Sequence, residues 1–87
     1  MEAVETRVAV IAIIVREGTQ VAVLNDLLHQ YGPYIVGRMG VPYREKGVNI
    51  ISVAMDAPGD VISALSGKLG RLEGVIAKTV YAPAGSV

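Results

Sequence analysis

The sequence has no cysteine, no tryptophan, no phenylalanine and a single histidine, His29. Without cysteine the chain can form no disulfide, no thiolate nucleophile and no thiolate metal site. One histidine supplies too few ligands for a zinc or nickel site within one subunit. We therefore predict that the protein holds no metal and no cofactor.

An excess of charge of one sign is also missing, because 8 Lys and Arg side chains balance 8 Asp and Glu side chains. No basic run is present, so the sequence lacks the electrostatic footprint that nucleic-acid binding needs. The longest apolar run, Val8 to Val15, is too short to span a bilayer. Glu2 and Glu5 precede that run, where a signal peptide would carry basic residues. We expect a soluble, cytoplasmic protein with no nucleic-acid or membrane partner.

Apolar residues are abundant, at 52% of the 87 residues, while charged residues make up 18%. A typical domain carries about 25% charged residues. A chain of this length forms one domain and buries only roughly 60–65% of its unfolded surface. We predict a domain over residues 6–82 with flexible ends at 1–5 and 83–87. We also expect self-association, because one small core cannot cover so much apolar surface.

Apolar periodicity and turn residues predict six elements in the order strand, helix, strand, strand, helix, strand, at residues 6–16, 21–31, 34–43, 48–56, 58–72 and 75–81. Gly32 and Pro33 are expected to end the first helix, with Gly32 in the left-handed conformation. Pro58 is expected at the first position of the second helix.

This order predicts an α+β fold, the ferredoxin-like βαββαβ sandwich, with two helices on one face of a four-stranded antiparallel sheet. Right-handed crossovers place the first and third strands in the middle and the others at the edges. Pro42 also favours an edge position for the second strand. The first strand is apolar on both faces, so we expect a homo-oligomer, either a dimer or a tetramer, that forms through the sheet face without helices or through the sheet edges.

The candidate site residues gather around Arg38, which stands between Gly37 and Gly40 in the predicted edge strand. Glycines in a strand mark a bulge or a close backbone approach. Either a small anionic ligand binds there and Arg38 meets its carboxylate or phosphate, or the strand is merely bent and Arg38 is solvated. His29 is either a metal ligand or proton carrier, or a residue suited to a helix C-terminus. Tyr43 suits a groove or an interface.

Catalysis has little support in the sequence. The serines lack the context of a nucleophile elbow, and one histidine would have to serve them all. An acylphosphatase, an enzyme of the same fold, needs a glycine-rich anion loop after the first strand, with an arginine following. Here the segment Arg16-Glu17-Gly18-Thr19-Gln20 puts a carboxylate where the phosphate would bind. We predict no enzyme and no catalytic residues.

Two motifs carry a family resemblance: LLHQYGPYIVGRMGVPY at residues 27–43 and ALSGKLGRLEGVIAKT at residues 64–79. With them the chain resembles the iron-only hydrogenase system regulators, small ACT-like proteins often encoded near hydrogenase maturation genes. The resemblance covers about residues 6–82. It implies a regulatory or ligand-sensing protein whose partners are a small molecule or a hydrogenase maturation protein. The alternative is a module that serves only protein interaction or oligomerisation.

The implied fold is similar to ACT domains and to the ligand-binding domain of nickel-responsive repressors. ACT domains bind amino acids at subunit interfaces near the turn after the first strand, a place that Gly18 occupies here. The histidines and cysteine of the nickel repressors have no counterpart beyond His29. The ligand-binding residues predicted from the sequence and the resemblance together are Gly18, His29, Arg38, Met39 and Tyr43.

Overall fold

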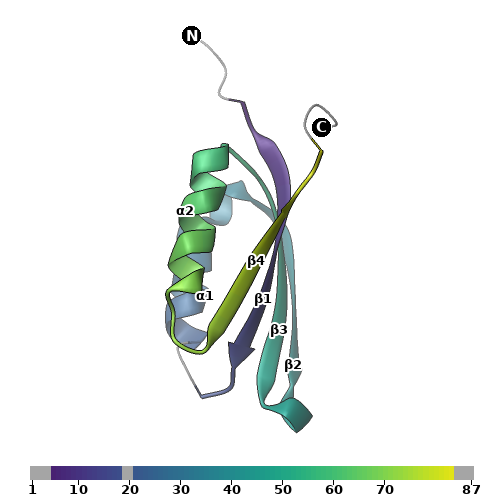
Figure 1. The fold of residues 1–87 in the computed structure, drawn as a ribbon, viewed down its shortest axis with the longest axis vertical. Helices are drawn as coiled ribbons and strands as arrows, with labels where there is room; N and C mark the ends of the chain where they lie inside the picture. Colours follow the sequence, from purple (N-terminus) through teal and green to yellow (C-terminus); the bar gives the residue numbers. More distant parts are fainter. Residues whose placement is uncertain (1–4, 19–20, 84–87) are drawn as a thin grey trace.

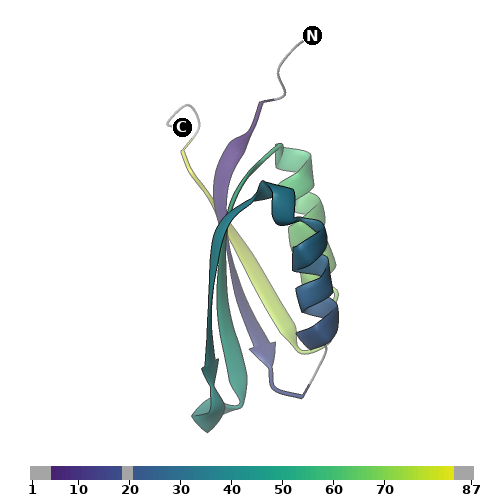
Figure 2. The ribbon, with the colours of Figure 1, turned by 180° about the vertical axis from the view of Figure 1, so that it is seen from behind.

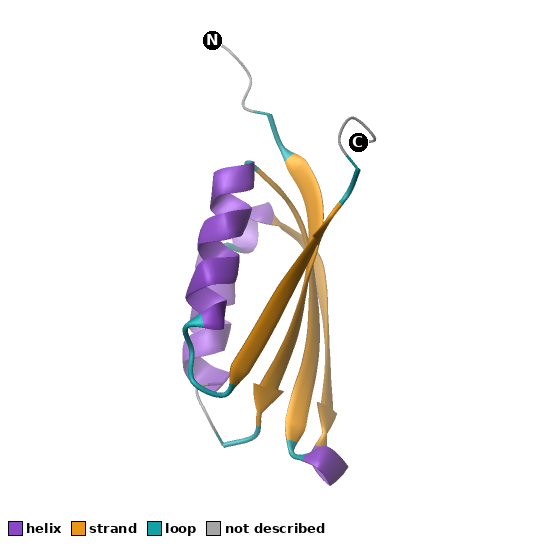
Figure 3. Ribbon diagram, viewed as in Figure 1, coloured by secondary structure: helices purple, strands orange, loops and turns teal. Residues whose placement is uncertain are grey.

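Four strands and two helices follow one another in the predicted order (Figures 1 and 3). The computed structural model describes residues 5–18 and 21–83, so most of the two ends predicted to be flexible, 1–5 and 83–87, lies outside the described residues. The elements, including two 3-10 turns η1 and η2, are β1 Arg7–Arg16, α1 Val21–Gln30, η1 Gly32–Tyr34, β2 Ile35–Tyr43, η2 Arg44–Lys46, β3 Val48–Ala57, α2 Gly59–Gly70 and β4 Val75–Tyr81.

The four strands form one antiparallel sheet in the order β2-β3-β1-β4. The predicted placement is confirmed: β1 and β3 are central, and β2 and β4 are the edges. Both helices lie on one side of the sheet, and none of the described helices and strands covers its other side (Figure 1). The structure is therefore the α+β, ferredoxin-like arrangement that the order of elements predicts. We call the side that carries the helices the inner face and the bare side the outer face.

Strand β1 shows how the two faces divide. Its burial alternates strictly, with Ala9, Ile11, Ile13 and Val15 buried and the residues between them exposed. Period-2 alternation is what a strand with one covered face must show. The sequence of β1 nevertheless alternates very little, because its exposed positions are also mostly apolar.

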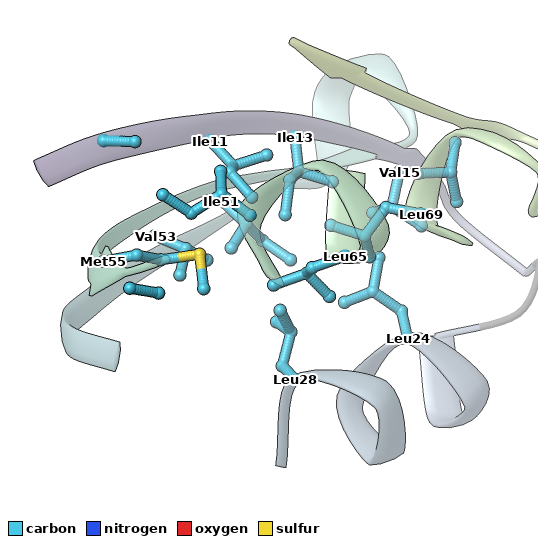
Figure 4. Packing of buried hydrophobic residues seen from close by; sticks show 14 residues of the cluster. Ile11, Ile13, Val15, Leu24, Leu28, Ile51, Val53, Met55, Leu65 and Leu69 are labelled. Carbon is cyan, nitrogen blue, oxygen red and sulfur yellow. The ribbon is translucent and has the colours of Figure 1, made fainter. Parts of the chain in front are cut away.

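The core lies between the inner face and the helices, where leucine side chains of the helices pack against apolar side chains of the strands (Figure 4). Its buried members in the described part of the chain are Ala9, Ile11, Ile13, Val15, Leu24, Leu28, Ile51, Val53, Met55, Ala57, Ile62, Leu65, Leu69 and Val75. No polar or charged side chain is buried among the described residues. The core is thus held by apolar packing, without an internal polar network.

Two details at the helix ends differ from the predictions. Gly32 does not take a positive φ; it opens the turn η1, and the Ile35 amide donates to its carbonyl. The tighter 3-10 turn therefore ends the helix in place of a left-handed residue. Pro58 precedes α2 as its N-cap, with extended backbone at φ −55° and ψ 146°, and its carbonyl accepts from the amides of Val61 and Ile62.

Two tight turns at one end of the molecule do need glycine. Gly47, at φ 65° and ψ 34°, closes η2 between β2 and β3. Gly18, at φ 82°, follows β1. A side chain in this left-handed region clashes with its own backbone, so glycine is favoured there. The Glu17 amide donates to the Gly47 carbonyl at 2.7 Å, which ties the two turns together.

Neither helix in the described part of the chain has the length and apolar character needed to cross a membrane.

Candidate functional site

A bulge near the start of β2 decides which way its side chains point. Ile35 pairs with Met55, but Gly37 pairs with Ala54, so β2 has one extra residue, Val36, at this place. Beyond the bulge Arg38 pairs with Val53, a buried residue of the inner face. Without the extra residue the ladder would set Arg38 opposite Ser52, on the outer face. The bulge therefore turns a charged side chain towards the helix layer, which is a known use of bulges beside functional sites.

Arg38 reaches helix α1 from this position. Its Nη2 donates to Oδ1 of Asn25 at 3.2 Å. No acidic side chain in residues 5–18 and 21–83 forms an ion pair with Arg38. Arg38 is exposed, and its guanidinium carries more donors than this one bond uses.

Arg38, Asn25 and His29 border a crevice of about 310 Å³ between α1, η1 and β2. Leu28, Gly32 and Ile35 complete its lining. Figure 2 shows α1, η1 and β2 on the near side of the molecule, with η1 linking the end of α1 to the start of β2. The crevice combines an apolar floor with a polar rim, which is the usual make-up of small-molecule sites. Its volume lies at the lower end of the usual range, roughly 300–1,000 Å³.

The electrostatics of the rim favour an anion. The last turn of α1 adds partial negative charge near His29, which opposes an anion by about 0.3–1 kcal/mol. Arg38 carries a full positive charge against the partial charge of the helix end, and its planar fork can make two hydrogen bonds to one carboxylate. The net charge at the rim is therefore positive.

The five predicted ligand residues do not all lie together. His29 and Arg38 meet at the crevice. Met39 and Tyr43 pair with Ser52 and Val48 on the opposite, outer face of the sheet. Gly18 lies in the turn after β1, at the end of α1 remote from His29, and a helix of ten residues is about 15 Å long.

Asn25 is a crevice residue that the sequence reasoning missed. It stands four residues before His29 on α1, so the two side chains share one helix face. That spacing was the available signal. It needed the knowledge that this helix face borders β2, and the sequence does not supply that.

The outer face is the second candidate surface. In its middle part, cross-strand pairing sets three rows that cross all four strands from β2 to β4: Gly37, Ala54, Val10 and Val80; Met39, Ser52, Ala12 and Lys78; and Val41, Ile50, Ile14 and Ile76. The first and third rows are entirely apolar. All four side chains of the third row are 44–63% exposed. Exposed apolar side chains gathered in this way make the outer face a candidate interaction surface.

The middle row contains the two polar residues of this surface, Lys78 and Ser52. Lys78 is on the edge strand β4, so its long side chain can carry the ammonium past the edge into water. Ser52 is the only polar residue of the three rows on a central strand, and it is half-buried. A further crevice of about 290 Å³, lined by Ile14, Ile76 and Arg16 among others, continues the apolar surface at one end.

No group of three or more His, Cys, Asp or Glu side chains able to hold a metal ion gathers in the described ranges 5–18 and 21–83.

Comparison with known proteins agrees with the fold. The solved structure of the uncharacterized protein TM1266 from Thermotoga maritima superposes with a TM-score of 0.88 at 38% sequence identity, over 91% of this chain and 100% of that one. No curated protein matches the chain. The model of the TM1266-like family, described as "Iron-only hydrogenase system regulator, putative", matches residues 7–79. By the match of its two motifs, its fold and most of its length, the chain belongs to the TM1266-like family.

Proposed function

We propose that this protein is a non-enzymatic, ACT-like regulator that works as a homo-oligomer, with a small ligand or a protein partner changing the geometry of the oligomer or its affinity for a third molecule. The outer face of the sheet is the observation that carries this proposal. The family description and the sequence resemblance suggest iron-only hydrogenase assembly as the regulated process.

The outer face is large enough to form a stable interface between two copies. Its strands are seven to ten residues long. Four strands about 4.8 Å apart, at about 3.3 Å per residue, give a face of roughly 450–650 Å². Two copies together would bury roughly 900–1,300 Å², a range that spans the minimum of about 1,000 Å² for a specific interface.

The position of β2 offers a way for a ligand to reach this interface. Arg38 projects from β2 towards the crevice, while Met39 and Val41 project from the same strand onto the outer face. A ligand that holds Arg38 would restrain the edge strand that borders the interface. If β2 can take two arrangements in the oligomer, a ligand that restrains β2 would shift the balance between them. Binding in the crevice would then be coupled to the geometry of the outer face.

Sedimentation velocity tests the oligomer, and thermal shift tests the ligand. We expect an assembly larger than the 9.1 kDa protomer at micromolar concentration. In a screen of amino acids, nucleotides and metal ions, a compound that binds the folded protein raises the melting temperature, and the rise grows with the logarithm of its concentration above the dissociation constant. Titration with purified hydrogenase maturation proteins tests the protein partner. A protomer that stays monomeric and responds to none of these additions would overturn the proposal.

A further inference from the structure

We infer that the crevice between α1 and β2 binds a small organic carboxylate, with Arg38 on the carboxylate and Leu28 and Ile35 against its apolar body. The inference rests on the proposed function, because it names the ligand class for a regulator of this kind.

Arg38 occupies a position of β2 that faces the helix side of the sheet. An inward position on a strand ordinarily carries an apolar side chain that completes the core. Here the bulge at Val36 brings Arg38 to such a position and leaves the apolar Met39 on the outer face, 65% exposed. The pattern is the reverse of what burial alone would select. A bulge that holds an arginine inward, beside a crevice, is explained by a ligand that needs it.

The rim of the crevice carries hydrogen-bond donors suited to a carboxylate. The planar fork of an arginine matches the two oxygens of a carboxylate. Arg38 has no acidic partner among residues 5–18 and 21–83, and its bond to Asn25 uses one donor and fixes the direction of the guanidinium. The Asn25 amide nitrogen and a ring nitrogen of His29 add further donors at the same rim. Each of the three polar side chains that line the crevice therefore carries a hydrogen-bond donor.

The floor of the crevice is apolar. Leu28 is buried and Ile35 is half-buried, and Gly32 adds no side chain between them. This floor suits a short branched or unbranched hydrocarbon, and it gives no partner to a second charged group. A volume of about 310 Å³ is sufficient for a ligand of a few carbon atoms.

A titration with matched probes, followed by ¹H–¹⁵N NMR, tests the inference on the full chain. The probes are 3-methylbutanoate, its neutral amide 3-methylbutanamide, and inorganic phosphate. We expect saturable shifts at residues 25–38 with the carboxylate, and binding that is about tenfold or more weaker for the amide, because the amide forms no charge-assisted pair with Arg38. Phosphate tests whether the apolar body matters, and it should bind more weakly than the carboxylate.

The Arg38→Gln variant should lose about tenfold or more in affinity for 3-methylbutanoate, and Arg38→Lys should fall between Arg38→Gln and the unaltered protein, since lysine keeps the charge and loses the fork. Arg44→Gln, which removes an exposed arginine in η2, is the matched control and should bind normally. Equal affinity of the carboxylate and the amide, normal binding by Arg38→Gln, or phosphate binding as tight as the carboxylate would each overturn the inference.

Sedimentation separates a failure of this inference from a failure of the proposed function. Arg38→Gln leaves the outer face intact, so it should sediment like the unaltered protein. Absence of carboxylate binding in a well-formed oligomer refutes the ligand class alone. A monomer that binds the carboxylate through Arg38 refutes the proposed oligomeric regulator and keeps the site.

Discussion

Replacing Val10 with threonine tests the interface with the least change to the protomer. Val10 lies on the central strand β1, in a wholly apolar row of the outer face, and it is 39% exposed. Threonine has nearly the same shape and keeps the β-branch that strands favour, so the protomer should fold normally. The matched control is Val23→Thr, which makes the same exchange on the exposed surface of α1, at a side chain 49% exposed.

The size of the effect follows from burial of a hydroxyl group. In a protein interior an unpaired hydroxyl costs roughly 1–3 kcal/mol. A two-fold interface uses the same patch on both copies, so each substitution counts twice and the cost becomes roughly 2–6 kcal/mol. Since about 1.4 kcal/mol corresponds to a factor of ten, Val10→Thr should weaken self-association at least about 30-fold. Val23→Thr should leave it within about a factor of two, as is usual for a surface exchange.

Sedimentation velocity over a concentration series gives the dissociation constants, and circular dichroism with thermal melting verifies that both variants are folded. The reasoning predicts a concentration-dependent oligomer for the unaltered protein and for Val23→Thr, and a shift to protomer for Val10→Thr. If Val10→Thr and Val23→Thr associate equally well, the outer face is not the surface through which copies meet. If the unaltered protein remains a protomer throughout, apolar excess does not drive assembly here.

Three further predictions concern the stability of the fold, measured by urea denaturation. Leu65→Ala removes a fully buried side chain of α2 and should cost about 3–5 kcal/mol, and a value below about 1 kcal/mol would contradict the described core. Gly47→Ala puts a side chain at φ 65° and should cost about 1–2 kcal/mol, whereas Gly47→Asn should cost less; equal costs would mean that the turn relaxes. Thr79→Val removes the 3.0 Å bond to Ser66 and should cost about 0.5–1.5 kcal/mol, while no added loss is expected in the double variant with Ser66→Ala.

The order of elements and the central strands were predictable because they depend on local signals. Apolar periodicity separated helices from strands, and the last strand, 75–81, was predicted with the bounds that the structure shows. The βαββαβ order then left one handed solution for the sheet, which the strand order confirms. The helix ends were less predictable. Glycine and proline are each compatible with more than one local conformation at a helix end. At the end of α1, Gly32 opens a 3-10 turn, and at the start of α2, Pro58 is the N-cap.

The site was harder to predict, because a single extra residue reverses the faces of a strand. The sequence around Arg38 alternates charged, apolar and glycine positions, and it does not say which side meets the helices. The glycines signalled a bulge, but only the pairing of Gly37 with Ala54 shows that Val36 is the residue left over. From that one offset it follows that Arg38 joins His29 at the crevice while Met39 lies on the outer face. Residues adjacent in the sequence thus belong to two different surfaces, and a signal passing between ligand and oligomer would have to cross only the thickness of strand β2.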